Sequence, residues 1–192
     1  MAGCIWRSHS LTMKTLDPLE FTRWCDGYGI ELDEHRWLRF RVEDRLTFLV
    51  RLPKGPYQTV ALAQWCFPFS EDKPFPGATI YFREWGIWNN LDEEMGMCAV
   101  LRMRAAYGEN RGLLEAPAQI FSEAEFPDAR AFWTLPMIFG WDAFLIPENH
   151  DYFVFNSHDE VISFVCRTRE RYEQLLGAFK NWNIEKGNWY FH

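Results

Sequence analysis

Three nearly continuous apolar runs near the C-terminus constrain the fold more than any other feature of the sequence. They occupy residues 141–146, 152–155 and 161–166, and short polar stretches containing Pro, Asn, Asp and Ser separate them. Short runs rich in aromatic and β-branched residues, bounded by turn-forming residues, are typical of β-strands. Because neither face of these runs is polar, we expect three consecutive strands in the centre of a sheet that is covered on both sides.

Two helices are predicted near the two ends of the chain. Residues 17–20 combine an acidic N-cap, a proline at the first helical position and a glutamate at the third, a combination that starts helices. Apolar side chains at positions 21, 24, 25 and 28 then share one face, and the helix ends near Gly27 or Gly29. The second helix begins near Thr168, and we expect it to pack on the sheet through Tyr172, Leu175, Leu176, Phe179 and Trp182.

Further strands and one short helix are predicted between these two helices. Residues 37–42 and 46–52 alternate between apolar and polar side chains, which predicts an antiparallel hairpin. The remaining predicted elements are strands at 78–83 and 119–121 and a short helix at 127–133 that Pro136 ends.

Two segments fit either a helix or a strand. Residues 57–67 follow Pro56, which favours a helix, although the pair Thr59 and Val60 also suits a strand. Residues 92–107 begin with acidic side chains and end with basic ones, as a helix dipole favours, but their apolar residues also alternate as in a strand. Both alternatives stay open, with a helix favoured at 57–67.

The order of the elements predicts the fold class. Helices and strands do not alternate regularly, so we expect an α+β fold, a mainly antiparallel sheet with helices packed against it. The length of 192 residues suits a single domain. We expect this domain to span residues 13–192, with residues 1–12 as an N-terminal extension and loop 68–77 as the candidate boundary between two subdomains.

Charge and cysteine usage restrict the partners and the location of the protein. The chain has 27 acidic residues against 20 Lys and Arg, a formal net charge of −7, which makes nucleic acid an unlikely partner and favours a basic one. The five cysteines form no Cys-x-x-Cys pair, and the sequence shows neither a secretory leader nor a membrane-spanning run. We therefore expect a cytoplasmic protein with reduced cysteines, no metal, no cofactor and no membrane contact. Cys25, Cys66 and Cys166 lie among apolar residues and are expected to be buried.

The polar cluster at 156–160 is the strongest candidate for a catalytic site. The common hydrolase, phosphate-loop and zinc-enzyme motifs are missing from the sequence. An antiparallel meander, however, places the start of strand 141–146 beside the residues that follow strand 152–155. A histidine flanked by carboxylates can act as a general base, although the same residues can simply stabilise a turn. The candidate catalytic residues are Asp142, His158, Asp159 and Glu160, and a second polar cluster occupies 148–151.

Aromatic residues supply the candidate binding sites. The chain contains 17 Phe, 10 Trp and 7 Tyr, and we expect some of these rings to lie on a usable surface. Arginines interleaved with an aromatic ring suit a nucleic acid or an anionic ligand, but the acidic residues nearby favour a salt-bridged sheet face. The rings at 189–191 suggest that the tail docks onto the body of the protein or onto another copy of the chain, which makes a homo-oligomer possible. The candidate binding residues are Trp85, Trp88 and Asn90 in an apparent loop, and Trp37, Arg39 and Arg41 on a predicted strand.

Together these features favour a binding protein over an enzyme. Negative charge speeds the encounter with a basic partner, and exposed Trp or Tyr side chains then anchor it. We therefore expect a non-enzymatic cytosolic protein that binds another protein, such as an inhibitor or an immunity-type partner of a basic protein. The alternatives are a small hydrolase-like enzyme that uses the histidine and carboxylate cluster, and a protein that binds a small ligand in an aromatic pocket.

Overall fold

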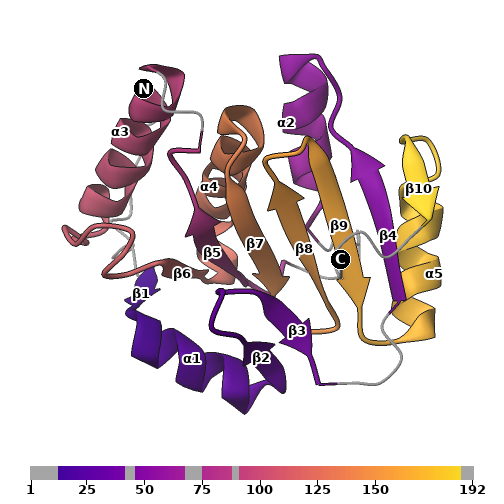
Figure 1. Ribbon diagram of the computed structural model, residues 1–192, viewed down its shortest axis with the longest axis horizontal. Helices are drawn as coiled ribbons and strands as arrows, with labels where there is room; N and C mark the ends of the chain where they lie inside the picture. The colour runs from indigo at the N-terminus through magenta and orange to yellow at the C-terminus, as the bar shows by residue number, and fades with distance from the viewer. Residues whose placement is uncertain (1–12, 42–45, 68–74, 88–90, 187–192) are drawn as a thin grey trace, which may run out of the picture.

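An eight-stranded antiparallel sheet forms the framework of the molecule (Figure 1). The computed structural model describes residues 13–41, 46–67, 75–87 and 91–186. Within these residues the strand order is β1-β6-β5-β7-β8-β9-β4-β10, and neighbouring strands pair antiparallel throughout. Five α-helices, a 3-10 helix (Glu123–Glu125) and a separate two-stranded sheet complete the described part of the chain. The fold is therefore α+β, as the order of the elements predicted.

The three strands predicted from the apolar runs lie at the centre of the large sheet. They are β7 (Asp142–Pro147), β8 (Tyr152–Ser157) and β9 (Val161–Cys166), and every residue in them is buried. Successive side chains enter two different cores, because Val154 packs on one face of the sheet and Phe153 on the other. The prediction of strands covered on both faces is confirmed. The flanking strands are β1 (Lys14–Leu16), β4 (Leu46–Arg51), β5 (Ala78–Glu84), β6 (Ala118–Phe121) and β10 (Ile184–Lys186).

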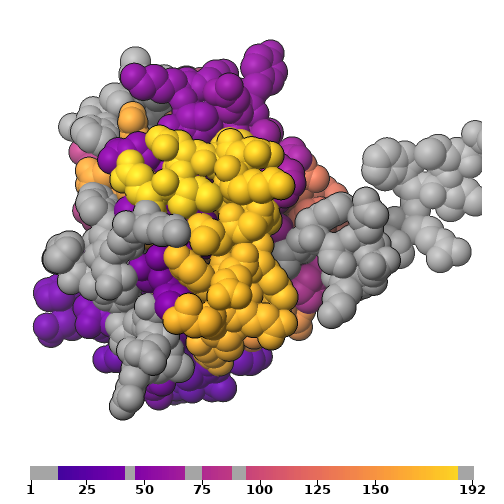
Figure 2. Space-filling view, turned by 90° about the vertical axis from the view of Figure 1, so that its right-hand side faces the viewer, coloured from indigo at the N-terminus to yellow at the C-terminus, as the bar shows by residue number. Residues whose placement is uncertain are grey.

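Four helices contribute to the core on one face of the sheet. They are α2 (Pro56–Trp65), α3 (Leu91–Ala106), α4 (Phe126–Phe139) and α5 (Arg169–Ala178). Figure 2 looks onto the edge that α5 and β10 form and shows α2 at one end of the molecule. The two segments that fitted either a helix or a strand are thus largely helical. The start of α5 matches the prediction, since the Thr168 hydroxyl accepts a hydrogen bond from the backbone N–H of its first turn.

The opposite face of the sheet carries α1 (Pro18–Gly27) and the hairpin of β2 (Ile30–Leu32) and β3 (Leu38–Phe40). The helix begins as its sequence predicted. The Glu20 N–H donates to the Asp17 carboxylate at 2.8 Å, and the Asp17 N–H donates to the Glu20 carboxylate at 3.1 Å. These two bonds satisfy backbone donors that a helix start leaves without partners. The buried side of α1 packs into the second hydrophobic core.

The predicted hairpin of residues 37–42 and 46–52 is wrong. Strand β3 pairs with β2 in the small sheet, whereas β4 pairs with β9 and β10 in the large one. Alternation identifies a strand but not its partner, and β2 has 3 residues, too few to show a pattern of its own. Residues 42–45, between the two strands, lie outside the described residues.

The prediction that Pro136 ends a short helix is also wrong. Helix α4 continues to Phe139 and stops at Gly140, which has a φ of +64°. A proline removes a single backbone donor, and hydrogen bonds to its own carbonyl hold the end of α4 in place. The Pro136 carbonyl accepts hydrogen bonds from the Trp141 N–H at 2.9 Å and from the Asn156 side chain at 3.1 Å.

The cysteines follow the expectation where the structure describes them. Cys25, Cys66 and Cys166 are buried and free, and burial raises the pKa of the Cys25 and Cys66 thiols to about 12. Cys98 is free and exposed. Cys4 lies outside the described residues.

Several other expectations concern segments that the structure does not describe. Residues 1–12, 68–74 and 187–192 contain the expected extension, most of the candidate subdomain boundary and the aromatic tail, and all three lie outside the described residues. In the described segments, every helix is too short or too polar to cross a membrane.

Candidate functional site

The structure brings Asp142 and His158 into direct contact. Asp142 begins β7 and His158 follows the end of β8, so the antiparallel pairing of these strands places them at one edge. The Asp142 Oδ1 atom accepts a hydrogen bond from the backbone N–H of His158 at 2.9 Å and lies 2.8 Å from the Nδ1 atom of its ring. The Asp142 side chain is 1% exposed, whereas that of His158 is 32% exposed. The aspartate therefore fixes both the backbone and the ring of the histidine.

Arg83 completes this cluster, and no local sequence pattern singled it out. Its Nη1 atom lies 2.5 Å from the Oδ2 atom of Asp142 and 3.1 Å from the Glu84 carboxylate. The guanidinium carbon lies 3.9 Å from the centre of the Trp37 ring, an arrangement that favours a cation–π interaction. Because β5 pairs with β7, Arg83 reaches Asp142 across two strands that are distant in the sequence.

The other two candidate catalytic residues lie at the turn between β8 and β9. The Asp159 Oδ1 atom is 3.8 Å from the Nε2 atom of His158, and its backbone N–H donates to the Ser157 hydroxyl. Glu160 has a φ of +59°, and its carbonyl accepts a hydrogen bond from the Leu52 N–H at 2.8 Å. Asp142 and His158 thus form a close pair, and Asp159 lies at its margin. The backbone contact of Glu160 instead joins the turn to Leu52.

The arginines among the candidate binding residues are matched by acidic partners. Arg39 lies 3.5 Å from Asp33, and Arg41 forms an ion pair with Asp26. These contacts agree with the salt-bridged face that the acidic neighbours favoured. The Trp37 ring is partly buried and packs edge-on against Phe155, with 4.9 Å between the ring centres.

Trp85 is the described member of the second group of candidate binding residues. It packs partly buried against the helix-covered core, and the Arg36 guanidinium lies 5.9 Å from its ring centre. Trp88 and Asn90 lie outside the described residues. The structure therefore shows contacts for one ring of this group only.

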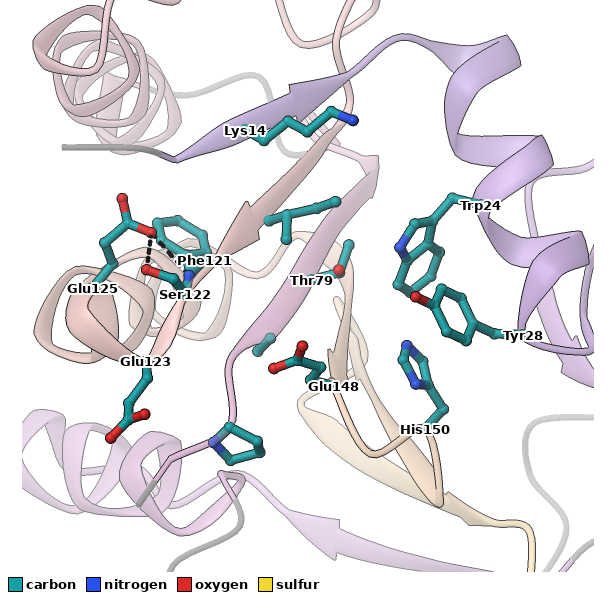
Figure 3. A pocket seen from close by; sticks show the side chains of 13 residues that line it. Lys14, Trp24, Tyr28, Thr79, Phe121, Ser122, Glu123, Glu125, Glu148 and His150 are labelled. Carbon is teal, nitrogen blue, oxygen red and sulfur yellow. Dashed lines mark hydrogen bonds between the residues drawn. The ribbon is translucent and has the colours of Figure 1, made fainter. Parts of the chain in front are cut away.

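A cavity of about 320 Å³ lies away from the Asp142 cluster, between the sheet, α1 and the turn that joins β7 and β8 (Figure 3). Its sheet side is formed by the start of β5, the end of β6 and the residues that follow β6. Trp24, Tyr28 and His150 stand together on the other side. Ligand pockets in proteins have volumes of about 300–1,000 Å³, so this cavity suits a single side chain or a small molecule.

Three rings make a corner at this cavity. The rings of Tyr28 and His150 are stacked, with centres 3.7 Å apart and planes 11° apart. The Trp24 ring is tilted by 56° to both, at 4.9 Å from Tyr28 and 5.3 Å from His150. Burial, and then the nearby Arg167, lower the pKa of His150 to about 4. At neutral pH the three rings of this corner are therefore uncharged.

Two further acidic side chains, Glu148 and Glu123, line the cavity. Glu148 extends from the β7–β8 turn and lies between His150 and the start of β5, and Glu123 lies at the far margin of the cavity with its carboxylate directed away from the rings (Figure 3). In the described part of the chain, neither carboxylate forms a hydrogen bond or an ion pair. The third acidic group, Glu125, is occupied because its carboxylate accepts hydrogen bonds from the backbone and the hydroxyl of Ser122. The only lysine or arginine in the described lining is the exposed Lys14.

Gly77 allows Glu148 to take this position. The residue has a φ of +114°, which an L side chain rarely adopts, and the Glu148 N–H donates to its carbonyl at 3.0 Å. A Cβ atom added at Gly77 would lie 2.9 Å from the Glu148 carboxylate and 2.8 Å from the Phe121 carbonyl. A glycine is therefore required where the carboxylate approaches the backbone of the sheet.

Sequence reasoning did not combine the residues of this pocket. The cluster at 148–151 was recognised as polar, and Trp24 and Tyr28 were assigned to the apolar stripe of α1. Their meeting depends on the fold, because α1 and the β7–β8 turn are far apart in the sequence.

Comparison of the chain with protein-family models, with curated protein sequences and with solved structures found no match. The function is therefore argued from the residues of this chain alone.

Proposed function

We propose that this protein binds a basic protein in the cytoplasm, as an inhibitor or an immunity-type protein does, and that the pocket of Figure 3 is the contact site. The observation that carries the proposal is the presence of an uncharged aromatic corner and two carboxylates in one cavity. The formal net charge of −7 adds long-range attraction for a basic surface.

The two kinds of group act at different distances. Carboxylates and net charge increase the rate of encounter with a basic partner and lose this effect as salt rises. Aromatic side chains supply the short-range energy once the surfaces meet, and Trp and Tyr are frequent hot spots in protein interfaces. Trp24 is partly buried and Tyr28 is 43% exposed, so both rings are held in place yet remain accessible.

Affinity capture with the full chain tests this proposal. The wild-type protein is immobilised on a resin and incubated, at low and at high salt, with an extract of the cells that produce it. A retained protein is identified, purified and titrated against the wild-type protein and its variants. We expect a basic protein, and we expect Trp24→Ala and Glu148→Gln each to weaken its binding by about tenfold or more.

Two variants control for general effects of lost rings and lost charge. Trp65 is 52% exposed on α2, away from the pocket, and Glu173 is exposed on α5, so Trp65→Ala and Glu173→Gln should keep the wild-type affinity. If the Trp24→Ala and Glu148→Gln variants bind the retained protein with the wild-type affinity, the assignment of the site is wrong. If a small metabolite binds tightly and no protein is retained, the pocket belongs to the alternative class, a binder of small ligands.

A second candidate function, a small hydrolase, is favoured by one contact. The Asp142 carboxylate lies 2.8 Å from the Nδ1 atom of His158, the arrangement in which an aspartate orients a histidine that acts as a general base. The same carboxylate also binds Arg83 and a backbone N–H, and these contacts equally serve to join β5, β7 and β8.

A panel of ester, phosphoester and peptide substrates tests this second function. Turnover that is lost in His158→Gln, with an unchanged melting temperature, supports an enzyme. If no substrate in the panel is turned over, or if His158→Gln retains full turnover, the cluster is structural.

A further inference from the structure

We propose that the pocket receives an arginine side chain of the partner. This inference rests on the proposed function and names the group that the partner inserts. The pocket is suited to a planar cation with several N–H donors, because an aromatic corner and two carboxylates with no partner among the described residues surround it. A neutral group would leave these carboxylates without a counter-charge, and an anionic group would be repelled by them.

The protein itself shows how this set of groups binds a guanidinium. Arg83 lies over the face of Trp37 at 3.9 Å and contacts two carboxylates, those of Asp142 at 2.5 Å and Glu84 at 3.1 Å. The described lining of the pocket contains groups of the same kinds, an indole ring and carboxylates, and includes no arginine of this chain. A guanidinium supplied by another molecule would meet the same kinds of group there.

Guanidinium fits this site better than the ammonium of lysine. Its planar fork carries five N–H donors, so it can bond two separate carboxylates while its face stays against a ring. An ammonium is a compact, strongly hydrated charge that gives up more hydration on entering an aromatic corner. The cavity of about 320 Å³ also lies at the small end of the range for ligand sites, in keeping with one extended side chain.

Lys14 provides a second test of the proposal, in which the expected change in affinity is opposite to that of Glu148. It is the single lysine or arginine in the described lining, and it lies at the margin of the cavity (Figure 3). A positive charge there repels an incoming cation. Removing this charge should therefore tighten the binding of a guanidinium, whereas removing the charge of Glu148 should weaken it.

The experiment titrates the full-length protein with N-acetyl-arginine amide and follows the indole N–H signals by NMR. The Trp24 signal is assigned from its absence in Trp24→Phe. We expect a saturable shift of this signal with arginine amide, a weaker response to N-acetyl-lysine amide, and no saturable response to the uncharged analogue N-acetyl-citrulline amide.

Glu148→Gln should weaken arginine binding by about tenfold or more, as the loss of a charge-assisted hydrogen bond implies. Lys14→Gln should tighten it by roughly twofold or more, the size of a surface charge interaction.

Trp65→Ala and Glu173→Gln serve as matched controls and should bind arginine amide as the wild type does. The inference is overturned if arginine amide gives no saturable shift at about 100 mM, far above the millimolar affinity that a single weak contact reaches. The inference is also overturned if citrulline amide or lysine amide binds with the same affinity as arginine amide. If a basic protein is captured through Trp24 and Glu148 while arginine amide fails, the proposed function stands and the arginine assignment fails. If arginine amide binds and no basic protein is captured, the site is a cation site and the proposed function fails.

Discussion

At the scale of single residues, a buried polar side chain joins three elements of the fold. Asn156 on β8 is fully buried, and its Nδ2 atom donates to the carbonyl of Pro136 at 3.1 Å and to that of Trp141 at 2.8 Å. These carbonyls lie at the end of α4 and just before β7. One amide therefore joins the end of α4 and the residue before β7 to the central strand β8.

Replacing this amide with a carboxyl group should be costly. Asn156→Asp removes both donors and places acceptor oxygens against two carbonyl oxygens, so we expect a loss of about 3 kcal/mol or more in the free energy of unfolding. Urea denaturation measures the loss. Asn183→Asp introduces the same chemical change at an exposed position and should cost less than about 0.5 kcal/mol. Equal losses in both variants would show that the contacts of Asn156 do not stabilise the fold.

At the scale of elements, the packing of α3 on α4 depends on the absence of one side chain. A Cβ atom at Gly96 of α3 would lie 2.4 Å from the ring of Phe139, the last residue of α4. The Phe139 ring also stacks on Trp141, with 5.4 Å between the centres, which limits its room to move. Gly96 thus sets how closely the two helices approach.

Two glycine-to-alanine changes should have opposite signs for this reason. Alanine favours a helix over glycine by up to about 1 kcal/mol, so Gly177→Ala in α5, with nothing within 4 Å of its Cβ position, should stabilise the protein by roughly 0.5 kcal/mol. Gly96→Ala should destabilise it by about 1–3 kcal/mol, because the new methyl group overlaps the Phe139 ring. Chemical denaturation of both variants gives the comparison. A stabilising Gly96→Ala would mean that α3 can shift away from α4 without cost.

At the scale of the whole molecule, local patterns predicted elements but not their distant partners. The apolar runs of β7 to β9 and the capping signals of α1 were sufficient to predict these elements, because each pattern lies within one element. The approach of Asp142 to His158 could also be expected, since β7 and β8 follow each other directly. Arg83 and the pocket could not, because they require the pairing of β5 with β7 and the docking of α1 on the sheet. Strands of 3 residues, such as β1 and β10, are too short to show alternation.

Acid stability should depend on two groups at separate places in the fold. The pKa of His150 is lowered from 6.5 to about 4, chiefly by burial, so between these values the unfolded chain binds a proton that the folded protein does not. The pKa of Glu109 is lowered from 4.5 to about 2, chiefly by the hydrogen bonds of Arg111, with help from the Thr15 hydroxyl of β1. Both shifts have the same sign for stability, because in each case the unfolded state takes up protons first as the pH falls.

The free energy of unfolding should therefore decrease in two overlapping steps on acidification. His150 accounts for the loss between about pH 6.5 and 4, and Glu109 for the loss between about pH 4.5 and 2. Denaturant unfolding at closely spaced pH values measures both. His150→Asn, which introduces a residue that tolerates the positive φ of 53° at this position, should flatten the first step and leave the second. Glu109→Gln should flatten the second step and leave the first. A first step that persists in His150→Asn would assign the proton uptake to another group, because asparagine does not titrate in this range.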